Sequence, residues 1–123
     1  MKNTKKKVLV VDDSEMVRNF HSYIIKMFGY EVDTAENGVV ALEKLLSEEY
    51  KLLVTDINMP KMDGNELIKN VQEHGIIIKI IIISTQEEYK AKFMGVEQDK
   101  GIQMIKPTDP EKLMKTIKML LEG

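Results

Sequence analysis

The feature that most constrains the fold of this chain is the regular alternation of short apolar runs with helix-like segments. Residues 8–11 form a continuous apolar run, which is typical of a parallel strand buried on both faces. Segments with strand character recur at 30–35, 52–55, 79–83 and 102–105, and helical patterns separate them. This alternation favours an α/β fold in which right-handed crossovers place helices on both faces of a parallel sheet. We therefore expect a doubly wound, five-stranded parallel sheet with five helices.

The first expected helix begins after Ser14, whose hydroxyl suits an N-cap, and ends at Gly29. Apolar residues recur through it at spacings typical of one helix face. The predicted buried face consists of Val17, Phe20, Ile24, Met27 and Phe28.

The second helix opens at Asn37 and Gly38, a fourth is expected over residues 87–94, and the last begins with Asp109 as N-cap and Pro110 in the first turn. The predicted buried residues are Ala41, Leu42, Leu45 and Leu46 in the second helix, Leu67, Ile68 and Val71 in the third, and Leu113, Met114, Ile117, Leu120 and Leu121 in the last.

Composition limits the function classes that the chain can serve. The net charge of −2 gives no general attraction to nucleic acid or anionic membranes, and the lack of cysteine excludes disulfides, thiolate zinc sites and thiol nucleophiles. The apolar run around 76–83 is too short to span a bilayer, and the basic start lacks the apolar stretch of a signal peptide. No repeat or linker appears, so we expect one cytoplasmic domain over 1–123 without an output domain.

Polar side chains stand where the expected strands end. Asp12 and Asp13 follow the first strand, Asp56 the third, Ser84 and Thr85 the fourth, and Lys106 and Pro107 the fifth. In sheets of this kind, functional sites form beyond the carboxyl ends of the strands. We therefore expect three acids, a pair of hydroxyls and an ammonium to converge at one edge.

Three carboxylates at close range repel one another unless their pKa values rise or a cation joins them. A site of oxygen ligands alone selects a hard cation, and one with few carboxylates and room for water or phosphate oxygens suits Mg²⁺ better than Ca²⁺. Such a site favours phosphoryl transfer, in which Asp56 attacks phosphorus in line. The acyl phosphate formed would be held by the metal, Lys106 and the Ser84 hydroxyl.

Four stretches, VLVVDDSEMVR, TDINMPKMDG, IIIIST and IKP, follow one another in an order and at intervals that resemble the response-regulator receiver domains of bacterial two-component signalling. The resemblance covers essentially the whole chain and is closest to the stand-alone chemotaxis type. It implies a flavodoxin-like (βα)5 fold with strand order 2-1-3-4-5.

The resemblance also implies roles for the acidic residues. Asp56 matches the aspartate that accepts the phosphoryl group. Asp13 and Asp56 match direct Mg²⁺ ligands, the backbone carbonyl of Asn58 matches a third, and Asp12 matches a residue that holds the metal through water.

Further matches surround this acidic group. Lys106 matches the lysine that pairs with the phosphoryl group, and Pro107 implies a cis Lys-Pro bond that aims it inward. Ser84 matches the hydroxyl that moves toward the phosphoryl group on activation. Pro60 and Gly64 match the loop that shapes the acceptor site.

The chain departs from the family pattern at two positions. Gln103 stands where the switch aromatic is usual, so ring burial coupled to hydroxyl movement cannot work through that residue. Thr85 stands where alanine or glycine is common, and its bulk is expected to slow hydrolysis of the phosphorylated form. Asn58 and Gln86 flank the path of the attacking water and are expected to tune the same lifetime.

The resemblance implies a phosphorylation-switched signalling module. A histidine kinase or phosphotransfer protein would supply the phosphoryl group, and the face around the fourth helix and fifth strand would bind a protein target. We expect no direct nucleic-acid contact, no membrane insertion and no enzymatic activity beyond self-phosphorylation and slow self-dephosphorylation. Chemotaxis, phosphorelays and other regulatory circuits all remain open.

Two other function classes compete with this interpretation. A flavodoxin-like module holding a nucleotide or flavin phosphate needs a phosphate-cradling loop after the first strand, but DDSE is anionic there. A metal-dependent phosphohydrolase with an aspartyl-phosphate intermediate usually carries a second acid two residues after the nucleophile, and that residue is Asn58 here.

Overall fold

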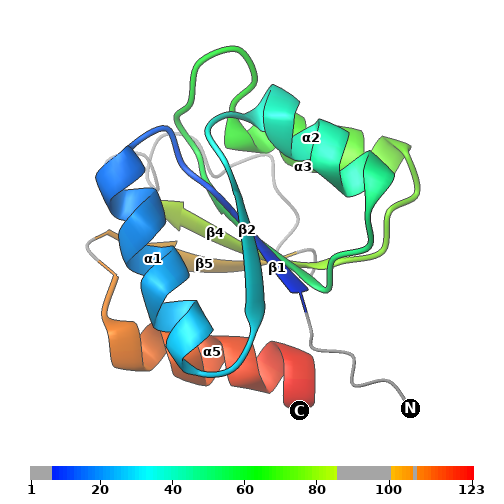
Figure 1. Cartoon of the computed structure of the whole chain (residues 1–123). Coiled ribbons are helices and arrows are strands. Elements are labelled where there is room, and N and C mark those ends of the chain that lie inside the picture. The colour runs from blue at the N-terminus through cyan, green and yellow to red at the C-terminus, as the bar shows by residue number, and fades with distance from the viewer. Residues whose placement is uncertain (1–6, 86–100, 107) are drawn as a thin grey trace.

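The five predicted strands form one sheet in which every neighbouring pair is parallel, in the order β2-β1-β3-β4-β5 (Figure 1). The structure is a computed structural model that describes residues 7–85, 101–106 and 108–123. Its elements are β1 (Lys7–Val11), α1 (Glu15–Met27), β2 (Glu31–Ala35), α2 (Gly38–Ser47), β3 (Leu52–Asp56), α3 (Gly64–Glu73), β4 (Lys79–Ser84), β5 (Ile102–Ile105) and α5 (Pro110–Glu122). The predicted fold class and strand order are confirmed. The predicted helix over 87–94 lies outside the described residues.

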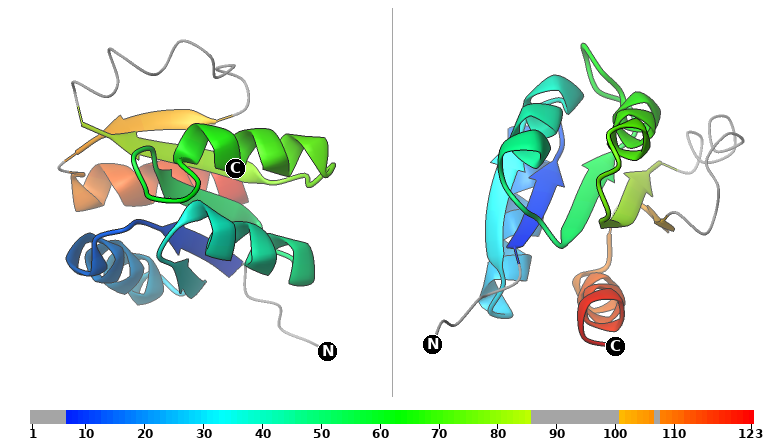
Figure 2. Two further views of the ribbon diagram at one scale, coloured as in Figure 1. Left: turned by 90° about the horizontal axis from the view of Figure 1, so that it is seen from above. Right: turned by 90° about the vertical axis from the view of Figure 1, so that its right-hand side faces the viewer.

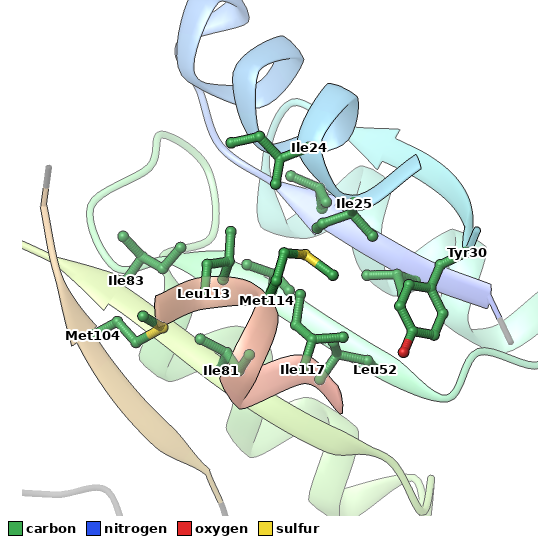
Figure 3. Packing of buried hydrophobic residues seen from close by; sticks show 13 residues of the cluster. Ile24, Ile25, Tyr30, Leu52, Ile81, Ile83, Met104, Leu113, Met114 and Ile117 are labelled. Atoms are coloured by element: carbon green, nitrogen blue, oxygen red, sulfur yellow. The ribbon is translucent and has the colours of Figure 1, made fainter. Parts of the chain in front are cut away.

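Helices cover both faces of the sheet. Figures 1 and 2 show α1 and α5 on one face and α2 and α3 on the other. Successive strand residues point to opposite faces, so Val8 and Val10 pack with α1 and α5, whereas Leu9 and Val11 pack with α2 and α3. Figure 3 shows the first of these clusters, where Ile24 and Ile25 of α1 and Leu113, Met114 and Ile117 of α5 gather over Leu52, Ile81, Ile83 and Met104.

Short polar side chains begin each described helix. The side chains of Ser14, Asn37, Asp63 and Asp109 are the N-caps, and each accepts a hydrogen bond from a backbone N–H of the first turn. At α3 the cap is reciprocal, because Glu66 also accepts from the Asp63 backbone. The caps fix where the helices start, and these starts lie at the carboxyl edge of the sheet.

The predicted buried face of α1 is wrong in part. Phe20, Met27 and Phe28 are exposed, with 46%, 65% and 50% of their surface accessible. The buried residues are His21, Ser22, Ile24 and Ile25. The helix carries two apolar lines, and the line from Met16 through Phe20 and Tyr23 to Met27 faces away from the sheet. The prediction mixed the two lines: Ile24 is buried as expected, but Phe20 and Met27 belong to the exposed line, because polar His21 and Ser22 occupy part of the buried one.

The buried faces of the other described helices follow the prediction more closely. All three predicted residues of α3 are buried, and so are Ala41 and Leu45 of α2. Leu46 is exposed and Leu42 only half-buried, so α2 buries a narrower stripe than expected. In α5 the core residues are Leu113, Met114 and Ile117, with Leu120 and Leu121 partly buried against them.

Candidate functional site

Three carboxylates gather at the carboxyl edge of the sheet. Asp12 and Asp13 follow β1 and Asp56 ends β3, its neighbour in the sheet. One oxygen from each lies within 4.8 Å of the others. Asp12 and Asp56 are only 2% and 4% exposed, whereas Asp13 is exposed to solvent. We call these three residues the acidic cluster.

Lys106 follows β5 and brings its ammonium to the acidic cluster. Its Nζ lies 3.2 Å from Oδ1 of Asp56 and 3.4 Å from Oδ2 of Asp12. Burial alone would lower the pKa of Lys106, but the charges of Asp56 and Asp12 outweigh it and raise that pKa. The ammonium therefore stays charged, and it offsets only one of the three negative charges beside it.

Burial is the main reason why the pKa of Asp56 rises to about 6, and the negative charge of Asp12 adds to the effect. Lys106 and the N–H of Ile57, which donates to Oδ1 at 2.9 Å, act in the opposite direction. The protein alone thus does not fully balance the negative charge of the ionised Asp56 carboxylate. A divalent cation would relieve this deficit, and a donor set of carboxylate oxygens fits Mg²⁺.

Two groups beside Asp12 hold the first strand end in place. The backbone N–H of Ser14 donates to Oδ1 of Asp12 at 2.9 Å, which leaves Oδ2 facing Lys106. The guanidinium of Arg18 donates to the Asp12 backbone carbonyl at 2.7 Å. Sequence reasoning assigned Arg18 no role, since nothing in its spacing shows that it turns back toward the strand.

Ser84 is fully buried at the end of β4. It follows Ile83, which is paired in the sheet with Asp56, so it stands beside the end of β3. Its hydroxyl has no hydrogen-bond partner among the residues that the structure describes. Its backbone carbonyl accepts from the N–H of Lys106 at 2.8 Å, which ties the ends of β4 and β5 together.

The remaining predicted tuning residues are only partly described. Gln103 lies on β5 opposite Ile82, and within the described ranges its buried side-chain nitrogen has no hydrogen-bond partner. Thr85 and Asn58 are exposed. Gln86 and Pro107 lie outside the described residues, so their roles stay predictions.

The loop between β3 and α3 rests against backbone at two glycines. The N–H of Gly38, at the start of α2, donates to the carbonyl of Met62 at 3.2 Å, and a Cβ on Gly38 would lie 2.5 Å from that oxygen. A Cβ on Gly64 would lie 2.4 Å from the Asp56 carbonyl oxygen. Gly64 was predicted to shape the acceptor loop, whereas Gly38 was read only as a helix start. A glycine where alanine would favour the helix was the available signal.

Comparison with known proteins identifies the family to which a chain with this site belongs. Residues 8–118 match the sequence model of the response regulator receiver domain. The chain belongs to this family. The resemblance inferred from the four motifs is therefore confirmed.

Relatives of this receiver domain include longer regulators. It is 34% identical over 116 residues to the alkaline phosphatase synthesis transcriptional regulatory protein PhoP of Bacillus subtilis, with 94% of this chain and 48% of PhoP covered. The chain thus spans about half the length of this curated relative. Within the described residues, no helix is long and apolar enough to cross a membrane.

Solved structures share the fold over nearly the whole receiver domain. The chemotaxis response regulator CheY4 of Vibrio cholerae is 35% identical, with a TM-score of 0.82 and coverage of 96% of this chain and 100% of that one. The response regulator TrrA of Thermotoga maritima, solved in complex with Mg²⁺-BeF, is 32% identical, with a TM-score of 0.83 and coverage of 94% and 99%.

Proposed function

We propose that this receiver domain accepts a phosphoryl group on Asp56 in a Mg²⁺-dependent reaction and that the modification switches a protein-binding surface. The observation that carries the proposal is the acidic cluster, with the Lys106 ammonium beside Asp12 and Asp56. A histidine kinase or a phosphotransfer protein is the proposed donor. The chain would have no activity on external substrates.

Asp12, Asp13 and Asp56 are the proposed Mg²⁺ site, with the Asn58 backbone carbonyl as a further ligand. The bound ion would neutralise charge on the phosphoryl oxygens during transfer. The Mg²⁺-BeF complex of TrrA, a protein with the same fold and 32% identity, supports this assignment. The low charge compensation of Asp56 in the metal-free chain supports it independently.

In the proposed transfer, a carboxylate oxygen of Asp56 forms a bond to phosphorus while the bond from phosphorus to the donor nitrogen breaks and the donor imidazole leaves. The Ile57 N–H and Lys106 both contact Oδ1, and these contacts hold the carboxylate in one orientation. Lys106 then pairs with the phosphoryl oxygens, which carry the charge formerly on the carboxylate. Hydrolysis of the acyl phosphate by water returns the carboxylate slowly.

The Ser84 hydroxyl is the proposed switch group. It is buried, and within the described parts of the chain it has no hydrogen-bond partner, which is costly unless another state supplies one. A phosphoryl oxygen on Asp56 would be that partner. Movement of the β4 end would pass to β5 through the bond between the Ser84 carbonyl and the Lys106 N–H. The changed surface would bind a downstream protein in chemotaxis, a phosphorelay or another circuit.

The proposal is tested by following acetyl phosphate consumption with Mg²⁺ present. A receiver domain consumes about one equivalent per chain rapidly and then continues only at the slow rate of its own hydrolysis. Samples without Mg²⁺ are expected to show no rapid phase. Sustained rapid turnover would instead indicate a phosphohydrolase, and the lack of any rapid phase with Mg²⁺ would contradict the proposal.

A further inference from the structure

A buried histidine lies behind the site and has no part in the proposed transfer. His21 of α1 is 3% exposed, and its Nε2 lies 3.3 Å from Oγ1 of Thr108, which is also buried. Thr108 stands between β5 and α5, directly before the N-cap Asp109. The hydrogen bond therefore joins the first helix to the segment that leads from Lys106 into the last helix.

The His21 imidazole is held in its neutral form. Burial has the largest effect and lowers its pKa; the negative charge of Asp12 opposes this in part, and the positive charge of Lys106 has the smallest effect and lowers the pKa further. A neutral imidazole buried in a core needs a hydrogen-bond partner, and Thr108 supplies it. Ser22, the next residue on the helix, is also buried, so the buried side of α1 carries two polar residues.

Three contacts that involve the described residues bear on the position of Lys106. On the side of β5, its N–H donates to the carbonyl of Ser84. In the other direction along the chain, Lys106 is separated by one residue from Thr108, whose hydroxyl contacts His21. Its ammonium must lie between Asp12 and Asp56, at 3.4 and 3.2 Å. Thr108 is two residues after Lys106, and its contact with His21 of α1 restricts how far Lys106 can move.

We propose that His21 is a positioning residue, which through Thr108 holds the segment after β5 so that the Lys106 ammonium stays between Asp12 and Asp56. The consequence for phosphorylation rests on the function proposed above, but the effect on the segment itself does not. His21 contacts no carboxylate of the acidic cluster in a described hydrogen bond or ion pair, so it acts on Lys106 rather than on the metal ligands.

The anchoring is tested first without any phosphodonor, by hydrogen exchange of the Lys106 amide measured by NMR. His21→Leu removes the hydrogen bond at similar volume, and it is expected to speed this exchange about tenfold relative to the Asp12 amide, which donates to Ala35 and serves as internal reference. His21→Gln, which keeps a polar group near the position of Nε2, is expected to restore slow exchange. Ser22→Ala is the matched control on the same helix. Equal exchange in His21→Leu and the unmodified chain would overturn the proposal.

The second test measures labelling by acetyl phosphate at saturating Mg²⁺. His21→Leu is expected to slow labelling about tenfold, because small displacements of a positioned group reduce rates strongly. In a Lys106→Met background the same substitution is expected to have no further effect. An equal further loss there would show that His21 acts elsewhere and would overturn the proposal. If the unmodified chain does not label, the proposed function fails, and amide exchange still decides the anchoring.

Discussion

The ammonium of Lys106 lies 3.2 Å from Oδ1 of Asp56, although their strands are not neighbours in the sheet. β4 separates β3 from β5, so the lysine side chain reaches across the end of β4 to contact Asp56 at the end of β3. Ser84 lies at that end and accepts from the lysine backbone. The three strand ends therefore form one connected group.

Removal of the Lys106 ammonium should slow phosphorylation without unfolding the chain. Lys106→Met leaves the aliphatic stem but removes the charge that faces Asp56 and Asp12. We expect labelling by acetyl phosphate, followed by intact-mass measurement, to slow by about a hundredfold. Lys115→Met, at an exposed position of α5, is the charge-matched control. A labelling rate equal to that of the control would contradict the role assigned to Lys106.

The raised pKa of Asp56 predicts how stability depends on pH in the metal-free chain. Its pKa rises from 3.8 to about 6 on folding, mainly through burial, so the folded state binds this proton more tightly than the unfolded state does. The resulting stabilisation is full below about pH 4 and is lost as pH rises through 6. Asp56→Asn has no carboxyl group to ionise, so its stability does not fall in this pH range for that reason. Urea unfolding should show the variant more stable by up to about 3 kcal/mol at neutral pH and little different at pH 4.

Mg²⁺ should reduce the difference in stability between the unmodified chain and Asp56→Asn at neutral pH. A ligand that binds only the folded state raises the unfolding free energy, and the acidic cluster loses one charged ligand in Asp56→Asn. Mg²⁺ is therefore expected to stabilise the unmodified chain more than the variant at neutral pH. Glu43→Gln, an exposed carboxylate on α2, controls for general charge effects. Equal stabilisation of all three chains by Mg²⁺ would contradict the metal assignment.

Gly64 should be required for the shape of the acceptor loop. A Cβ there would lie 2.4 Å from the Asp56 carbonyl oxygen and 3.0 Å from Cα of Ile57, and both are backbone atoms that cannot move aside cheaply. We expect Gly64→Ala to cost about 1–3 kcal/mol in urea unfolding. It should also slow labelling by at least about tenfold, because the displaced backbone carries Asp56.

Gly75→Ala provides the matched comparison for this glycine. Gly75 has a φ of +70° after α3, with open space around it, so alanine there costs about 1–2 kcal/mol through backbone strain alone. The two variants should be similarly destabilised, but Gly75→Ala should label normally. Slow labelling in both would mean that general destabilisation, rather than the loop, limits the reaction.

Thr85 is predicted to prolong the phosphorylated state. It follows Ser84 directly in the chain and is exposed, whereas Ser84 is fully buried. Thr85→Ala removes bulk that we expect to restrict the approach of water to the acyl phosphate. Loss of label after removal of the phosphodonor should therefore be faster in the variant, and an unchanged rate would refute the prediction.

The strands were predictable because their signals are local and agree with the packing. Ile80 to Ile83 are β-branched, bounded by Lys79 and Ser84, and buried on both faces, so burial and propensity favour the same element. The strand ends were predictable for the same reason. Once the order of strands was known, the meeting of Asp12, Asp56 and Lys106 followed from the topology.

The orientation of α1 and the contacts behind the site were not predictable in this way. α1 offers two apolar lines, and the one that faces the sheet carries His21, whose partner Thr108 lies 87 positions away in the sequence. The contact of Gly38 with Met62 is also long-range, and its hydrogen bond joins backbone atoms, so the sequence marks it only by the glycine itself and does not identify Met62 as the partner. Such contacts depend on the orientation in which the helices pack on the sheet, which the periodicity of apolar residues does not specify.

Intact-mass spectrometry after incubation with acetyl phosphate and Mg²⁺ tests the central claim most directly. The account predicts that the unmodified chain gains the mass of one phosphoryl group and that Asp56→Asn, which differs by one buried carboxylate at the end of β3, gains none. No gain in the unmodified chain, or a gain that persists in Asp56→Asn, would contradict it.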